Sequence, residues 1–310
     1  MIINASSRTD IPAYFSDWFF QRLKAGYVYV RNPYYPNQIT KYILNPEVVD
    51  SIVFCTKNPH PMLSRLKLLK DYHPYFFVTI TPPYEKEIEP HVPSFQDVIY
   101  DIQELSLSLG SHSVSFRYDP IFINQYYTIE KHIQTFDIIT KQLEGYTHEC
   151  VISFIDLYEK TKKNFPGIQE VSLNEQQYLA EAFAKIAAQR GIHIKTCAEK
   201  LDLSEYGITH EGCITRQILK DVTGYPLKEL KSQPLRQGCH CYPSRDIGEY
   251  DTCLHGCIYC YANEDKQLVQ EKYKRHDPSS PLLIGHIHSD DVIRLAKQES
   301  YIERQLSFDL

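Results

Sequence analysis

Three cysteines near the C-terminal end are the residues whose spacing points most directly to chemistry. Cys253, Cys257 and Cys260 occur as C-x3-C-x2-C within the segment DTCLHGCIYCYAN. Because three thiolates in one tight loop leave one iron of a [4Fe-4S] cubane without a protein ligand, that iron can bind a small molecule. Gly256 would let the backbone bend closely around such a cluster. The spacing therefore predicts an oxygen-sensitive [4Fe-4S] cluster on this loop.

Zinc is the alternative metal for the same loop. It would need a fourth ligand, either His255 or a cysteine of the preceding Cys239-His-Cys241 segment. Zinc sites more often use paired C-x2-C units, so the asymmetric triplet favours iron and sulfide. Cys239 and Cys241 could supply a fourth ligand, bind a second metal or serve only in packing.

The other cysteines are more isolated in the sequence. Cys197 follows a predicted strand and could donate a hydrogen atom or ligate a metal, although a small buried side chain is the favoured role. Cys55, Cys150 and Cys213 are interpreted as packing residues. The nine cysteines are odd in number, and in the cytoplasmic compartment expected below they favour metal binding over a disulfide framework.

Polar side chains follow each predicted strand and are the candidate catalytic residues. Arg8, Lys57 and Arg117 could hold a carboxylate or a phosphate, whereas the acidic members could bind an amino group, a ribose or a second metal. Several could instead pair with one another. The full set of candidates is Arg8, Asp10, Lys57, Arg117, Asp119, Asp156, Cys197 and Glu199.

The elements that must position these residues alternate between strand and helix. Helical periodicity covers 94–110, 128–143 and 172–191, and a short apolar run follows each of these segments. Parallel pairing through right-handed crossovers follows from this order. The predicted strands are 2–5, 51–55, 75–80, 114–118, 150–155 and 192–197.

The fold class predicted from this order is α/β, as a complete or partial (β/α) barrel of the TIM type. No glycine-rich dinucleotide loop follows the first strand, which disfavours an open doubly wound sheet. Residues 1–200 are expected to form the barrel core, with an inserted hairpin near 27–44. Residues 201–310 are expected to form a C-terminal cysteine-rich cap that binds the cluster, and a tail packed on the barrel.

Composition limits the partners and the compartment. The net charge is −6, and no run of lysine and arginine could track a line of phosphates, so generic nucleic-acid binding is disfavoured. No stretch approaches the roughly 20 apolar residues of a membrane span. The segment MIINASSRTD does not resemble a signal peptide, so we expect a cytoplasmic protein.

The cysteine segment also resembles known proteins. TCLHGCIYCYAN resembles the cluster loop of the radical SAM superfamily, in particular the branch related to spore photoproduct lyase. From SSRTDIP through RNPYYP, FCTKNP, FRYDPI, SFIDLY and TCAE to DIGEYDTCLHGCIYCYAN, the chain resembles the bacterial domain-of-unknown-function family 1848. The radical SAM superfamily places its loop after the first barrel strand, whereas here the loop follows all six predicted units.

This resemblance implies a cofactor and a set of roles. Cys253, Cys257 and Cys260 would hold the [4Fe-4S] cluster, whose open iron takes the amino and carboxylate groups of S-adenosylmethionine. Reductive cleavage would yield a 5′-deoxyadenosyl radical that abstracts hydrogen from a substrate in the barrel. Tyr259 would lie near the adenine. Because the chain has no Gly-Gly-Glu segment for the methionine amino group, Asp10 or Glu199 would substitute.

Three functions are therefore compared. The leading hypothesis is a radical SAM-like enzyme that takes a small polar substrate and a reductant such as flavodoxin or ferredoxin. The second is a (β/α) barrel hydrolase or lyase stabilised by zinc. The third is a non-enzymatic iron-sulfur electron carrier or sensor, in which Cys239 or Cys241 completes the cluster.

Overall fold

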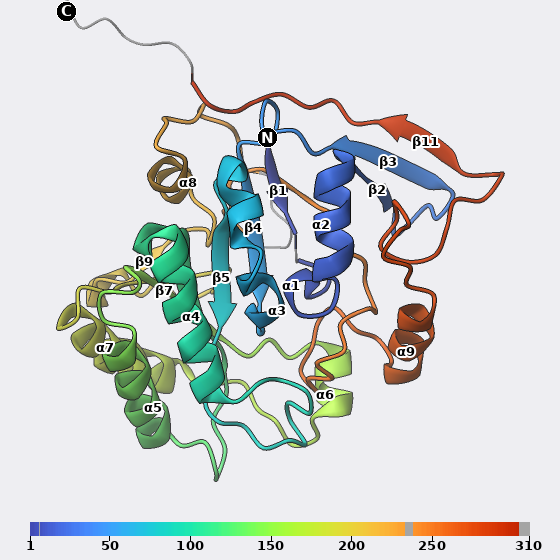
Figure 1. Cartoon of the computed structure of the whole chain (residues 1–310). Coiled ribbons are helices and arrows are strands. Elements are labelled where there is room, and N and C mark those ends of the chain that lie inside the picture. The colour runs from blue at the N-terminus through green and yellow to red at the C-terminus, as the bar shows by residue number, and fades with distance from the viewer. Residues whose placement is uncertain (6, 233–237, 304–310) are drawn as a thin grey trace, which may run out of the picture.

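Eight parallel strands form the main sheet of the protein (Figure 1). The computed structural model describes residues 1–5, 7–232 and 238–303. The order of the strands across the sheet is β10-β1-β4-β5-β6-β7-β8-β9. Their bounds are β1 Ile2–Asn4, β4 Ser51–Thr56, β5 Tyr75–Thr79, β6 Val114–Ile121, β7 Glu149–Phe154, β8 His193–Thr196, β9 Thr209–His210 and β10 Ser244–Asp246.

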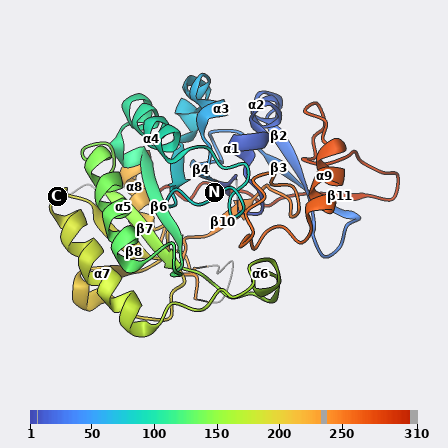
Figure 2. The same cartoon turned by 90° about the horizontal axis from the view of Figure 1, so that it is seen from below.

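Helices cover one face of this sheet. Figure 2 shows α3, α4, α5 and α7 in an arc outside the strands. The helices and 3-10 turns are α1 Ile11–Tyr14, α2 Ser16–Ala25, α3 His60–Leu63, η1 Leu66–Tyr72, α4 Phe95–Leu109, η2 Ser111–Ser113, α5 Ile129–Gln142, α6 Glu159–Asn164, α7 Leu173–Ala188, η3 Ser204–Tyr206, α8 Arg216–Thr223 and α9 Lys266–Lys274. The α/β class is confirmed, and among the described strands β9 and β10 remain two separate edges, so these strands do not close a barrel.

Alternate residues of each strand enter two different cores, because successive side chains of a strand point to opposite faces. On β5, Phe76 and Val78 join the core beneath the outer helices, whereas Phe77 joins a second core on the opposite face. Ile218 and Leu219 of α8 belong to that second core. Helix α8 therefore packs on the face of the sheet opposite the outer helices.

The predicted helices are present, and their caps explain where they begin. Ser94 and Thr128 accept hydrogen bonds from the first turns of α4 and α5. Ser172 and Glu175 form a complete capping box at the start of α7. The amphipathic faces of these helices then pack against the sheet, as their periodicity predicted.

The predicted hairpin is also present, within a second, smaller sheet. Strands β2 (Tyr27–Arg31) and β3 (Gln38–Ile43) pair antiparallel, and β11 (Val292–Leu295) lies parallel to β3. Figure 1 shows this red strand beside the blue hairpin. The C-terminal segment thus returns to the N-terminal part of the chain.

Two strands of the main sheet were not expected from the sequence. Strands β9 and β10 both lie past residue 200, in the segment predicted to be a cap. They are two and three residues long and contain no apolar residue, whereas β1, also three residues long, begins with two isoleucines. Because β10 pairs with β1, with Asn4 opposite Asp246, the segment that follows β10 begins beside the end of β1.

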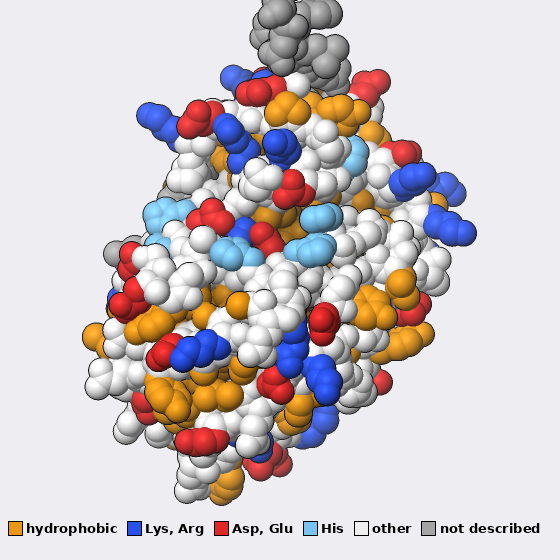
Figure 3. All heavy atoms as spheres, turned by 90° about the vertical axis from the view of Figure 1, so that its left-hand side faces the viewer, with side chains coloured by type: hydrophobic (Ala, Val, Ile, Leu, Met, Phe, Trp, Pro, Cys, Tyr) orange, Lys and Arg blue, Asp and Glu red, His pale blue; other side chains and the backbone are white. Residues whose placement is uncertain are grey.

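The surface mixes charges of both signs. On the face shown in Figure 3, Lys and Arg side chains lie among Asp and Glu side chains, with histidines gathered near the middle. In the part of the chain that the structure describes, no helix is long and apolar enough to cross a membrane.

We predict that Phe136→Ala lowers the free energy of unfolding by about 3–5 kcal/mol, because it removes a large buried ring from the core. Phe136 of α5 stacks on Phe183 of α7 with 4.1 Å between ring centroids. Urea denaturation measures the change. Ile138→Ala on the same helix is the matched control, since Ile138 is 48% exposed. Equal losses for the two variants would contradict the prediction.

Candidate functional site

The loop that carries Cys253, Cys257 and Cys260 lies at the carboxyl ends of the first strands. The Thr252 hydroxyl donates to the hydroxyl of Thr9, just past β1, at 2.7 Å. Figure 1 shows this orange segment below the sheet, near α1 and α6. The ends of β1 and β4 and the cysteine loop therefore form one candidate site, although the loop comes from the other end of the sequence.

The three loop thiols are half-buried and interact electrostatically with one another. Burial raises the pKa of all three thiols, and the other two thiols and Asp10 add to this effect at Cys253. Lys57 acts in the opposite direction on Cys257. A bound metal centre would reverse this balance, because coordinated thiols lose their protons.

Asp10 joins three segments of the site through four hydrogen bonds. Its Oδ1 accepts from the backbone N–H of Ala13 at 3.1 Å and from the Thr56 hydroxyl at 2.6 Å. Its Oδ2 accepts from the backbone N–H of Lys57 at 2.8 Å and from Nε2 of His255 at 2.8 Å. The carboxylate thus caps α1 and fixes both the end of β4 and the cysteine loop.

His255 has both ring nitrogens engaged. Nε2 donates to Asp10, and Nδ1 lies 3.0 Å from the Tyr14 hydroxyl and 3.3 Å from the carbonyl oxygen of His91. A zinc ion could bind this imidazole only by displacing one of these partners. The structure therefore gives His255 a positioning role in the loop and does not favour it as a fourth zinc ligand.

Glu89 is a member of the site that sequence reasoning missed. It accepts hydrogen bonds from Lys57 Nζ at 2.9 Å, from the Thr81 hydroxyl at 2.7 Å and from the Tyr259 hydroxyl. Burial opposes its ionisation, but Lys57 and these hydrogen bonds hold the pKa of Glu89 below its usual value. Glu89 lies in a connecting loop far from any predicted strand end, so no local pattern marked it.

The three cations predicted to bind an anion are all paired within the protein. Lys57 pairs with Glu89 as described, and Arg117 Nη2 lies 2.9 Å from Asp119 Oδ2. Arg8 Nε lies 3.6 Å from Oδ1 of Asp246. The expectation that several of these charges pair with one another is therefore met for Arg8, Lys57 and Arg117.

Glu199 lies just past the end of β8, on the side of the sheet away from β1 and β4. Its Oε1 accepts from the Ser153 hydroxyl at 2.7 Å and from the backbone N–H of Phe154 at 2.9 Å. Burial, with smaller contributions from Asp119 and Asp156, raises the pKa of Glu199 to about 7, although the hydrogen bonds from Ser153 and Phe154 act in the opposite direction. Glu199 is thus poised to exchange a proton near neutral pH.

Asp156 differs from the other acidic candidates because it is exposed. The hydroxyl of Tyr158 donates to its Oδ2 at 3.3 Å. Lys160, on the following helix α6, donates to the backbone carbonyl of Tyr261 in the cysteine loop. This contact places α6, which follows β7, against the cysteine loop. The loop therefore contacts the segment after β7 as well as the segments after β1 and β4.

Three of the cysteines outside the loop form a second group. Ligand atoms of Cys197, Cys213 and Cys241 all lie within 4.8 Å of one another. Among the described residues, the loop cysteines do not belong to this group. Cys213, interpreted from the sequence as a packing residue, is therefore part of a thiol cluster. Cys241 lies with that cluster rather than completing the ligand set of the loop.

The three loop cysteines come from one short segment. Among the described residues, their ligand atoms do not form a group within 4.8 Å of one another, whereas those of Cys197, Cys213 and Cys241 do. The buried polar atoms of the described residues that have no hydrogen-bond partner include Asn263 Oδ1, just after the loop, and Asp246 Oδ2, at the end of β10. Asn263 donates to the backbone carbonyl of Cys253 at 2.7 Å, so one of these unpaired oxygens is fixed beside the loop.

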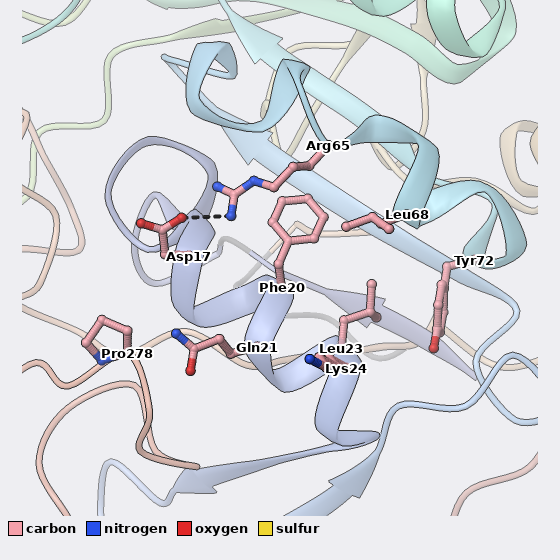
Figure 4. Close-up of a pocket in the computed structure, with 9 residues that line it drawn as sticks. All are labelled: Asp17, Phe20, Gln21, Leu23, Lys24, Arg65, Leu68, Tyr72 and Pro278. Carbon is pink, nitrogen blue, oxygen red and sulfur yellow. Dashed lines mark ion pairs between the residues drawn. The ribbon is translucent and has the colours of Figure 1, made fainter.

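A cavity lies away from this site. It measures about 640 Å³ and opens between α2 and η1. Figure 4 shows the ion pair between Asp17 and Arg65, 2.7 Å apart, at one side of it. A smaller cavity of about 390 Å³ has Glu89 and Thr81 in its wall. This second cavity borders the candidate site from the side of β5.

We predict that Glu89→Gln destabilises the protein by about 3 kcal/mol at pH 7, because Lys57 loses its buried partner. The pKa of Glu89 is lower in the folded protein, so its stabilising effect is complete above its unfolded pKa of about 4.3 and is lost as the pH falls through the lower folded value. Urea curves at pH 7, 5 and 3.5 should show the gap between the two proteins narrowing.

The control for this pH series is Glu87→Gln, two residues away and exposed. It should change the free energy of unfolding by no more than about 0.5 kcal/mol at any of these pH values. A gap between Glu89→Gln and the unsubstituted protein that stays constant down to pH 3.5 would refute the ion-pair argument.

We also predict that Asp10→Ala costs about 3 kcal/mol, because it leaves buried donors without an acceptor and removes the cap of α1. Urea denaturation again provides the measurement. Asp17→Ala is the control, since the Asp17 side chain is 76% exposed and an exposed ion pair contributes about 1 kcal/mol or less. A loss for Asp10→Ala no larger than that of Asp17→Ala would count against the role of Asp10.

Comparisons with known proteins identify a family. No curated protein and no solved structure matches the chain. The family described as "Domain of unknown function (DUF1848)" matches residues 2–262, a range that begins with β1 and ends with the cysteine loop. Both groups of cysteines fall inside the matched range. The chain therefore belongs to the DUF1848 family.

Proposed function

We propose that this protein is an iron-sulfur enzyme of the radical SAM type. Cys253, Cys257 and Cys260 would bind a [4Fe-4S] cluster at the carboxyl ends of the parallel strands. The substrate would be a small polar molecule, and a reductant such as flavodoxin or ferredoxin would supply electrons. When bound, the cluster supplies an electron and an open iron position for the amino and carboxylate groups of S-adenosylmethionine.

The observation that carries this proposal is the position of the loop in the sheet. Counted from the edge strand β10, the main sheet runs β10, β1, β4, β5, β6, β7, β8, β9, and all strands after β10 are in chain order. The cysteine loop directly follows β10. It therefore follows the first strand of that spatial order, which is where the radical SAM superfamily carries its loop. Its late place in the sequence is accounted for by a permuted strand order.

The protein's own residues would prepare this site in three ways. Asp10 holds His255 and so fixes the path of the loop between Cys253 and Cys257. Lys57 favours the thiolate form of Cys257. Glu89 fixes the hydroxyl of Tyr259, so the ring beside Cys260 is held in one orientation where it could contact the adenine.

Of the two acidic residues considered for the methionine amino group, we favour Glu199. All four hydrogen bonds of Asp10 serve to hold the site together, and a ligand would have to break them. Among the described residues, hydrogen bonds engage only Oε1 of Glu199. Its second carboxylate oxygen is thus available for a cationic group.

We predict that anaerobic reconstitution of the full chain gives about four iron and four sulfide on the loop. Addition of S-adenosylmethionine should then change the electron paramagnetic resonance spectrum of the reduced cluster. Dithionite should release 5′-deoxyadenosine and methionine. Cys257→Ala should abolish both the loop cluster and the products, because a thiolate ligand is lost.

Cys150→Ala is the matched control, since Cys150 is buried beneath the outer helices and belongs to neither cysteine group. It should retain the iron and the products. An intact cluster that never yields 5′-deoxyadenosine would refute radical cleavage. Zinc without iron or sulfide would instead support the (β/α) hydrolase or lyase.

A further inference from the structure

Four cysteines outside the loop gather on the face of the sheet opposite the outer helices. They come from three segments: Cys197 just past β8, Cys213 just past β9, and Cys239 with Cys241 before β10. We propose that these four thiolates bind one zinc ion in a closed structural site. This inference does not depend on the function proposed for the loop.

The spacing of the sulfurs suits a single ion. Those of Cys197, Cys213 and Cys241 lie within 4.8 Å of one another, and Cys213 Sγ is 3.3 Å from Cys241 Sγ. A tetrahedral zinc with bonds of about 2.3 Å places its sulfurs about 3.8 Å apart. In a cubane each thiolate binds a different iron, so the sulfurs lie farther apart. Cys239 is not part of this group of three, but its side chain interacts with that of Cys241, so a change of its rotamer on metal binding would supply the fourth ligand.

The backbone segments that carry Cys213 and Cys241 lie in close contact. A Cβ atom at Gly212 would lie 2.5 Å from the backbone nitrogen of Cys241, so only glycine permits this contact. Next to it, the backbone N–H of Tyr242 donates to the carbonyl of Ile214 at 2.7 Å. These contacts hold the segments of Cys213 and Cys241 side by side before any metal binds.

The surroundings indicate a structural role and not a catalytic one. All four cysteines are buried, the most exposed being Cys213 at 8%. Apolar side chains of the second core pack around them, among them Val151 and Leu219. Four protein ligands complete a tetrahedral zinc, so no position remains for water or substrate.

The position of the four cysteines implies that the ion would join the two edges of the sheet. β9 and β10 are the two unpaired edges of the described sheet. Cys213 follows β9 by three residues, and Cys241 precedes β10 by three. A zinc ion shared by these cysteines would reinforce the backbone hydrogen bond between Tyr242 and Ile214, which joins the segment after β9 to the segment before β10. It would thereby hold β10, and with it the start of the cysteine loop.

The metal content of the full chain tests this proposal. Protein expressed with zinc in the medium should contain about one zinc per chain, and zinc-edge X-ray absorption should show four sulfurs at about 2.3 Å. Cys213→Ser and Cys241→Ser should each lower the zinc content at least tenfold. Cys150→Ser should retain it, because Cys150 is buried but lies in the other core.

A variant that lacks the loop cysteines separates the two sites. Cys253→Ala with Cys257→Ala and Cys260→Ala should lose iron and sulfide yet keep the zinc. Retention of zinc by Cys213→Ser, or loss of zinc from the loop variant, would overturn the assignment. One iron atom bound by these four cysteines in place of zinc would overturn it as well.

A measurement on the unsubstituted protein covers the case in which Cys213→Ser does not fold. The four cysteines should resist alkylation until a chelator removes the zinc, as read by mass spectrometry of the digested chain. Alkylation at the same rate before and after chelation would overturn the proposal. So would a disulfide between Cys213 and Cys241 in freshly purified protein.

Discussion

The candidate site depends on the hydrogen bonds that the buried carboxylate of Asp10 accepts. Burying a carboxylate is costly unless hydrogen bonds replace its lost water, and Asp10 receives four. The donors belong to α1, to the end of β4 and to the cysteine loop. One side chain thereby fixes the relative positions of segments more than 240 residues apart. The structure thus gives Asp10 a role in holding the site together, while its predicted role in binding a ligand stays a prediction.

The pairing of β10 with β1 is the second constraint. Three residues of β10 lie parallel to β1, and the cysteine loop begins directly after them. The loop therefore meets the carboxyl ends of the strands even though it lies late in the sequence. If the four cysteines near β9 and β10 bind zinc, the metal would support this short edge strand, which few backbone hydrogen bonds hold. The two cysteine groups would then have complementary roles, one in chemistry and one in holding the sheet edge.

How far the sequence predicted this structure depends on the range of the interactions involved. Helices α4, α5 and α7 were predicted because their apolar periodicity and their caps at Ser94, Thr128 and Ser172 are local features. The hairpin near 27–44 was predicted because its turn segment, NPYYPN, is also a local feature. Glu89 was missed because its partners are distant in the sequence, and Cys213 was missed because it stands alone there. Strands β9 and β10 were missed because they are short and contain no apolar residue that would mark a strand.

By itself, the sequence determined the α/β class, six of the eight described strands of the main sheet and the compact spacing of Cys253, Cys257 and Cys260. These features follow from patterns within a few residues, where covalent geometry limits the backbone conformations that the chain can adopt. Only the tertiary structure decided that Arg8, Lys57 and Arg117 pair with acids, that Asp10 is a structural hub and that Cys197 and Cys213 approach Cys241. Those contacts join residues far apart in the chain, so they depend on the strand order and on close backbone approaches such as that at Gly212, which no local spacing encodes.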